Sequence, residues 1–122
     1  MDASSLARRQ ALGRLGFGVG LVAVPGLLAG GWVGGVADRR EGQTLAIGLG
    51  ARDVALALGT LGALRSGAAA APWLRAGMLA DFGDLLATLR ARDSLPPLAL
   101  PVVAAIAGGS VLLGAWLQRA VD

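Results

Sequence analysis

Apolar residues along this chain gather into four long segments, and short polar stretches separate them. The apolar segments cover residues 15–37, 43–64, 68–89 and 95–117. A helix of about 20 apolar residues is long enough to cross the hydrocarbon core of a bilayer. The pattern therefore predicts an all-α fold, an integral membrane four-helix bundle with antiparallel up-down topology, as a single domain over residues 1–122. A soluble amphipathic bundle is the alternative, but it requires polar helix faces that the first and fourth segments do not have.

Small residues recur at four-residue spacing within these segments. Such rows form bare helix faces that allow a second helix to approach closely in lipid. We expect Pro25 to kink the first segment, because proline cannot continue the hydrogen bonding of a helix. Helix packing is predicted at five glycines, namely Gly26, Gly30, Gly34, Gly59 and Gly77.

Four charged residues lie deep inside the second and third segments: Arg52 and Asp53 in one, Asp81 and Asp84 in the other. A charge at the centre of a bilayer costs about 2.5–3.5 kcal/mol on insertion scales, so such residues require partners or a function. At about 1.5 Å per residue, Arg52, Asp81 and Asp84 lie within one or two helical turns of each other in depth. The spacing predicts a cross-helix bridge from Arg52 to Asp81, to Asp84 or to both.

The deep charges do not balance, because Arg52 is predicted to be the single deep cation beside three acids. Two carboxylates that share a dry site with one cation cannot both stay ionised at low cost. We therefore expect one of the three aspartates to be protonated at neutral pH. Asp53 points about 100° away from Arg52 on the helix and needs another partner most. The network has three possible roles: fixing helix register, moving a proton or small polar solute, or binding a headgroup or a partner subunit's charge.

The composition excludes several classes of chemistry. The chain has no His and no Cys, so it holds no Ser–His–Asp or Cys–His catalytic set, disulfide or thiol redox site. We expect no enzymatic activity, no cofactor and no metal site. All 11 basic residues are Arg, and the net charge is +3. The arginines are scattered between apolar segments rather than clustered, which argues against a nucleic-acid partner.

The arginines of the polar segments bear on orientation. In the predicted antiparallel topology six arginines lie on the same side as the termini, namely Arg8, Arg9, Arg14, Arg65, Arg75 and Arg119. Four lie on the other side, namely Arg39, Arg40, Arg90 and Arg92. Positive loops favour the cytoplasm, so both termini are predicted to be cytoplasmic in a bacterial inner membrane. An export signal with the Arg8–Arg9 pair, cleaved near Ala37, is the alternative for the amino-terminal part.

The motifs of the second and third segments also suggest a family. Gly50-Ala51-Arg52-Asp53 in one and Ala80-Asp81-Phe82-Gly83-Asp84 in the next are the relevant sequences. They resemble those of an uncharacterised family of bacterial and fungal four-helix integral membrane proteins, with a G-x-R-[DE] motif in helix 2 and an Asp motif in helix 3. The resemblance implies the same fold and a paired role for Arg52 and Asp84, and it implies no activity.

The sequence thus predicts a small polytopic membrane protein. Its expected role is that of a structural or accessory subunit, which associates through Gly/Ala helix faces. Expected partners are membrane lipid and either further copies of the chain or another membrane protein subunit. The alternative is a small transporter or channel protomer that uses a protonatable Asp site. A polar cavity that reaches the carboxylates from one side would favour the alternative.

Overall fold

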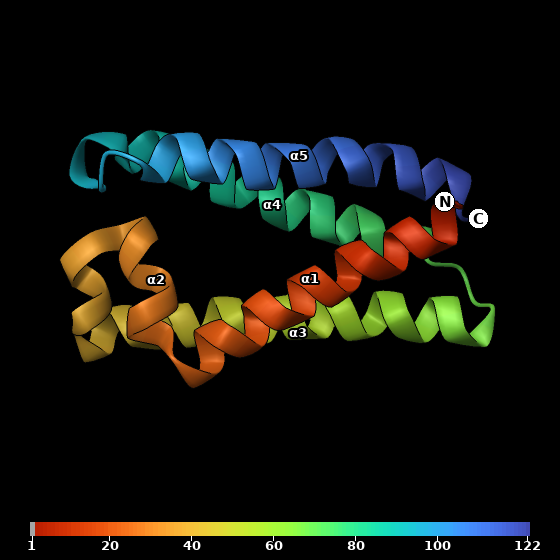
Figure 1. Cartoon of the computed structure of the whole chain (residues 1–122), viewed down its shortest axis with the longest axis horizontal. Coiled ribbons are helices and arrows are strands. Elements are labelled where there is room, and N and C mark those ends of the chain that lie inside the picture. The colour runs from red at the N-terminus through yellow and green to blue at the C-terminus, as the bar shows by residue number, and fades with distance from the viewer. Residues whose placement is uncertain (1) are drawn as a thin grey trace.

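The fold consists of helices joined by short turns (Figure 1). The structure is a computed structural model that describes residues 2–122. The α-helices are α1 (Ala3–Ala23), α2 (Pro25–Val33), α3 (Arg40–Ser66), α4 (Ala71–Ala91) and α5 (Ala99–Ala120). Two 3-10 helices, η1 (Gly34–Asp38) and η2 (Arg92–Ser94), lie in the connections. Residues 2–122 contain no β-strand, so the predicted all-α class is confirmed.

The first predicted span is broken rather than kinked. Helix α1 begins at Ala3, well before residue 15, and ends at Ala23. Val24 leaves the helical region with φ −134° and ψ 62°, and Pro25 then starts α2. Proline disfavours a helical conformation in the residue before it and lacks the N–H that a continuing helix needs. The axes of α1 and of the segment Pro25–Asp38 differ in direction by 105°.

The other helices differ from the predicted segments mainly at their ends. Helix α3 begins at Arg40, so the expected polar loop around Gly42 is already helical. Gly67 ends α3 with φ 72° and ψ 14°, a left-handed conformation that glycine adopts at little cost. Helix α5 begins at Ala99 instead of residue 95. Pro96 and Pro97 lie in the turn before it, where their missing N–H groups leave no helical bond unmade.

Two aspartates cap helix starts. The Ser5 backbone N–H donates to Asp2 Oδ1 at 2.7 Å, and this bond lowers the pKa of the Asp2 carboxyl. Asp122 accepts from the backbone N–H groups of Ala70 and Ala71, at 2.9 and 2.7 Å. Its carboxylate therefore satisfies the free N–H groups at the start of α4 and fastens the end of the chain to that helix.

The long helices form two pairs, α1 with α3 and α4 with α5, and contacts between the pairs are sparse. Figure 1 shows the α4–α5 pair above the α1–α3 pair, with both termini at the same end of the molecule. One small core, around Leu21, Ala29 and Ala46, joins α1, α2 and α3. Another, around Leu74 and Leu117, joins α4 and α5 to the start of α1. Only the second core therefore joins the two helix pairs, and it does so at one end.

Two helices, α3 and α5, are each long and apolar enough to cross a membrane. Helix α1 and the segment Pro25–Asp38 meet the same criterion together, as one broken span or a re-entrant loop. Helix α4 is not among these candidates, and it carries Asp81 and Asp84 within its length. Length and composition thus support two membrane spans, or three with the bent pair, rather than the four regular spans predicted from the sequence.

The five predicted packing glycines have different surroundings. A Cβ added at Gly59 would overlap the ring of Trp73, and one added at Gly77 would lie 3.3 Å from the Arg14 guanidinium. Gly26 lies against the Ala37 carbonyl within the turn region, and Gly34 ends α2 with φ 69°. No atom of the described residues lies within 4 Å of a Cβ added at Gly30. Gly30 therefore faces open space, whereas Gly26 also lies near Gln43 of α3 and Gly34 lies near Pro96.

Candidate functional site: a charged network beneath a groove

Five charged side chains meet between the two helix pairs. Arg14 comes from the middle of α1, Arg52 and Asp53 come from α3, and Asp81 and Asp84 come from α4. All four residues predicted for an intramembrane polar network are therefore brought together. Arg14 is the member that the sequence reasoning missed, because it had been counted with the arginines at the membrane surface.

Each arginine forms a two-point pair with one aspartate of α4. Arg14 Nη1 donates to Asp81 Oδ1 at 3.0 Å, and its Nη2 donates to Asp81 Oδ2. Arg52 Nη1 donates to Asp84 Oδ1 at 3.0 Å, and its Nη2 donates to Asp84 Oδ2 at 2.7 Å. The planar guanidinium fork matches both carboxylate oxygens, which makes such pairs strong and fixes their geometry. Of the bridges predicted for Arg52, the one to Asp84 is present and the one to Asp81 is replaced by Arg14.

Asp53 connects the two pairs through a single oxygen. Its Oδ1 accepts from Arg14 Nη1 at 3.2 Å and from Arg52 Nε and Nη2 at 3.3 and 3.2 Å. Its other oxygen, Oδ2, has no hydrogen-bond partner among residues 2–122, although the side chain is only 6% exposed. No fully enclosed side-chain oxygen or nitrogen of the described residues lacks a partner. Asp53 Oδ2 therefore touches open space.

The charge balance differs from the predicted one. Arg52 is not the single deep cation, because Arg14 lies at the same site with a side chain that is 12% exposed. The two pairs with Asp81 and Asp84 are each neutral as ion pairs. The network contains two arginines and three aspartates, and Asp53 is the aspartate without a two-point partner of its own. Asp53 was expected to need a partner besides Arg52. Its Oδ1 has that partner in Arg14, whereas its Oδ2 has no hydrogen-bond partner among residues 2–122.

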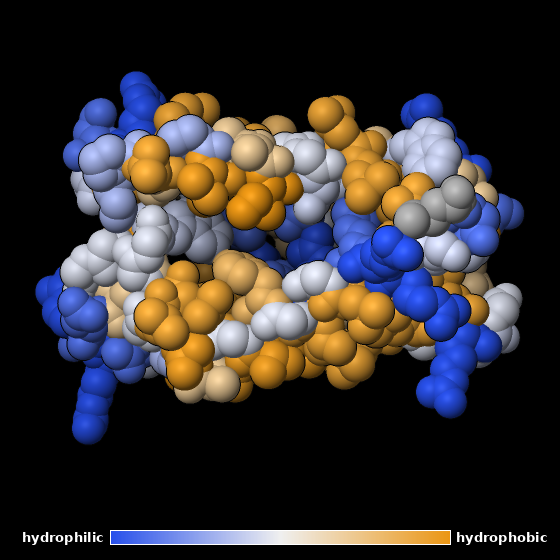
Figure 2. All heavy atoms as spheres, in the orientation of Figure 1, coloured by the Kyte–Doolittle hydropathy of each residue, from blue (hydrophilic) through white to orange (hydrophobic). Residues whose placement is uncertain are grey.

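A groove of about 770 Å³ opens above this network. Its floor includes Arg14, Asp53, Asp81 and Asp84. Its walls come from α1, α2 and α5 and are mainly apolar, with Phe17, Leu28, Trp32, Leu98, Val102 and Ile106 among them. Figure 2 shows it as a hollow between hydrophobic side chains, with hydrophilic atoms visible inside. The bend after α1 turns α2 away, and this geometry leaves the space between α1 and α5 open.

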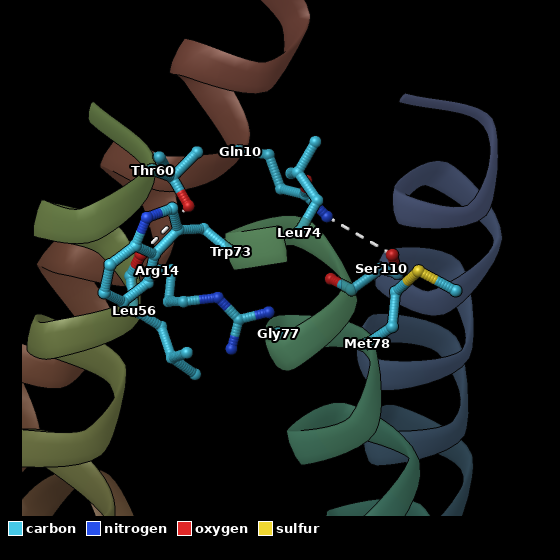
Figure 3. Close-up of a pocket in the computed structure, with 10 residues that line it drawn as sticks. Gln10, Arg14, Leu56, Thr60, Trp73, Leu74, Gly77, Met78 and Ser110 are labelled. Atoms are coloured by element: carbon cyan, nitrogen blue, oxygen red, sulfur yellow. Dashed lines mark hydrogen bonds between the residues drawn. The ribbon is translucent and has the colours of Figure 1, made fainter. Parts of the chain in front are cut away.

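Arg14 also lines a second, much smaller pocket, which shares Gln10 and Ser110 with the groove. This pocket measures about 10 Å³, and its lining includes Leu56, Thr60, Trp73 and Gly77. Figure 3 shows the guanidinium extending from α1 toward Gly77 of α4. A side chain at position 77 would press on the guanidinium, whereas glycine leaves it room. Arg14 thus lines both the small pocket and the groove.

Two hydrogen bonds span the groove's ends. Trp32 Nε1 of α2 donates to Thr88 Oγ1 of α4 at 2.9 Å. Gln10 Nε2 of α1 donates to the Ser110 carbonyl oxygen of α5 at 3.3 Å, as Figure 3 also shows. Trp32 thereby supports the groove wall. These bonds link the two helix pairs on either side of the charged floor.

The arrangement suits binding of a positively charged or hydrogen-bond-donating group better than metal ligation. Among residues 2–122, no group of three or more acidic side chains is placed to hold a metal ion. The carboxylates at the floor are engaged by arginines, apart from Asp53 Oδ2.

No family model, no curated protein and no solved structure matches this chain. The resemblance to the uncharacterised four-helix family therefore stays a prediction.

Proposed function

We propose that this chain is a multi-pass membrane protein that acts as a small transporter or channel protomer. In this proposal the groove admits a solute to the Arg–Asp network, and Asp53 is its protonatable or cation-binding group. The observation that carries the proposal is the groove itself, whose floor is formed by Asp53, Asp81 and Asp84. An accessory subunit that used these charges only for helix register would enclose them.

The charge pattern is compatible with a membrane location, even for α4. Its two acidic residues pair with arginines of α1 and α3, so their charges face the protein interior rather than lipid. Intramembrane ionisable residues are tolerated where they pair with each other or line a cavity, and they then mark substrate or ion pathways. The four long helices would then cross the bilayer in alternating directions, with α1 and α2 together as the first crossing.

Access of water to the network tests this proposal. The chain has no cysteine, so single-cysteine variants report one position each. Ser110 lines the groove, and Leu112 lies close by on the same helix with 75% of its surface exposed outside the groove. We expect Ser110→Cys to react with a water-soluble, membrane-impermeant thiol reagent at least about tenfold faster than Leu112→Cys, because a hydrated cavity ionises thiols and lipid does not.

In a transporter the labelling should also depend on the side of the membrane, since its pathway opens to one side at a time. In a channel the labelling should proceed from both sides. Sealed vesicles of both orientations distinguish the two sides. Equal and slow labelling of Ser110→Cys and Leu112→Cys from both sides would show a dry network and would contradict the transporter proposal.

An accessory role is the second candidate, and a separate observation favours it. Gly108 and Gly109 of α5 have no atom of the described residues within 4 Å of an added Cβ. Small residues that are left uncovered can receive a helix of a second copy or of another membrane protein. Slow labelling of Ser110→Cys together with a stable oligomer in detergent would select this candidate.

A further inference from the structure

The charged network beneath the groove contains three aspartates and two arginines, and Asp53 is the aspartate with a free oxygen. Asp53 is buried, lines the groove and leaves Oδ2 without a hydrogen-bond partner among residues 2–122. Asp81 and Asp84 each use both oxygens on one guanidinium. A complementary ligand group is therefore a cation that can also donate a hydrogen bond.

The walls of the groove specify the rest of the ligand. They are mainly aliphatic, and they include two aromatic side chains, Phe17 and Trp32. Aromatic faces attract cations and pack well on apolar groups. A volume of about 770 Å³ lies in the range of roughly 300–1,000 Å³ in which pockets enclose drug-sized ligands.

We propose that the groove binds amphipathic amines, with the ammonium group on Asp53 and the apolar part along Phe17, Trp32 and α5. The proposal rests on the proposed function and names its substrate class. An ammonium carries a positive charge and several N–H donors, so it can neutralise Asp53 and satisfy Oδ2 at once. An anionic headgroup would meet the excess negative charge, and a neutral headgroup would leave it in place.

Fluorescence of Trp32 gives a direct binding test. A variant with Trp73→Phe and Trp116→Phe keeps Trp32 as its single tryptophan. Titration of the full chain in detergent with 8-bromooctylamine should quench Trp32 in a saturable way. The half-saturating concentration should be at least about tenfold lower than that of 8-bromooctanol, because a charge-assisted hydrogen bond to a buried carboxylate is gained.

Asp53→Asn provides the decisive variant. It removes the carboxylate charge of Asp53 and keeps an oxygen for both arginines, so we expect the amine to bind about as weakly as the alcohol.

A second variant, Gly31→Leu, fills the groove from α2, where an added Cβ meets no atom within 4 Å. It should abolish saturable quenching by both compounds. Trp116, which lies 52% exposed and away from the groove, reports unspecific partitioning when it is the single tryptophan.

The outcomes separate this inference from the proposed function. Equal half-saturation by amine and alcohol, or an unchanged amine affinity in Asp53→Asn, overturns the amine proposal. If Ser110→Cys is still labelled rapidly by the water-soluble reagent in that case, the transporter proposal stands although the amine proposal fails. Slow labelling of Ser110→Cys together with no saturable quenching by either compound overturns both.

Discussion

At the scale of residues, the three aspartates of the network are bound differently by the two arginines. Asp81 and Asp84 sit in closed two-point pairs, whereas Asp53 shares one oxygen between both arginines. Closed pairs are expensive to break, because removal of one partner leaves the other charge buried without compensation. The same asymmetry separates a structural part of the network from a part that can take a ligand.

Arg14→Ala tests the structural part. It leaves Asp81, which is 8% exposed, without a cation, so we expect a loss of about 3–5 kcal/mol in the free energy of unfolding. The double variant Arg14→Ala/Asp81→Asn should recover part of this loss, since no charge is left unpaired. Unfolding titrations in detergent measure both, and the exposed Arg8→Ala on the same helix serves as the control. A double variant no more stable than the single one would show that the pair is not coupled.

The sequence predicted much of this site from depth and charge alone. The depth of Arg52, Asp81 and Asp84 along opposed helices predicted a bridge from Arg52 to one or both aspartates, and the structure has the one to Asp84. Asp53 stood out because its charge lacked a partner. Arg14 was not predicted, since the apolar run was taken to start at Leu15, which put Arg14 at the membrane surface. Had Pro25 been read as the end of the helix, Arg14 would have fallen near the middle of a helix that starts at Ala3.

At the scale of elements, the break between α1 and α2 decides what kind of site forms. A proline kink was predictable from Pro25, but the size of a bend depends on what the following segment packs against. Here Ala29 and Ala37 pack with Leu21 and Ala46, and this core holds the chain in its turned position. Tertiary contacts of this kind are not visible in local sequence. The groove, which depends on the bend, was therefore not predictable either.

The crossing of α1 and α3 gives a prediction at this scale. A Cβ added at Gly50 would lie 2.6 Å from the Gly18 carbonyl oxygen, whereas one added at Gly48 would meet no atom within 4 Å. We expect Gly50→Ala to lower the free energy of unfolding by about 1–3 kcal/mol, because the helices must separate. Gly48→Ala should be neutral or raise it by about 0.5–1 kcal/mol, since alanine favours helix. Equal stability of the two variants in detergent would contradict the close crossing.

At the scale of the whole molecule, the two helix pairs are joined at one end by the core around Leu74 and Leu117 and in the middle by charge. At the other end the Trp32–Thr88 hydrogen bond links α2 to α4. The middle therefore contains few apolar contacts between the pairs, and the groove lies there. Because charged side chains rather than an apolar core connect the two helix pairs here, the helices stay separated on the groove side of the network. The fold thus leaves an open groove above a charged floor, which is an arrangement suited to admitting a ligand.

The path of the chain predicts that both termini lie on one side of the membrane. Figure 1 places them at the same end of the molecule, with α1 and α2 together as one crossing. Reporter fusions at each end, one fluorescent only in the cytoplasm and one active only outside it, test this. Signals from opposite sides would show that the bent segment is re-entrant and does not cross.

Which side the termini occupy depends on a smaller margin than the sequence suggested. Arg14 belongs to the network, so the count on the side of the termini falls from six to five, against four on the other side. The positive-inside rule then still places both termini in the cytoplasm. Because Arg8→Ala/Arg9→Ala lowers the count to three against four, we expect part of the molecules to invert. Arg39→Ala/Arg40→Ala gives five against two and should keep the natural orientation, so inversion by both double variants would show that another feature sets the topology.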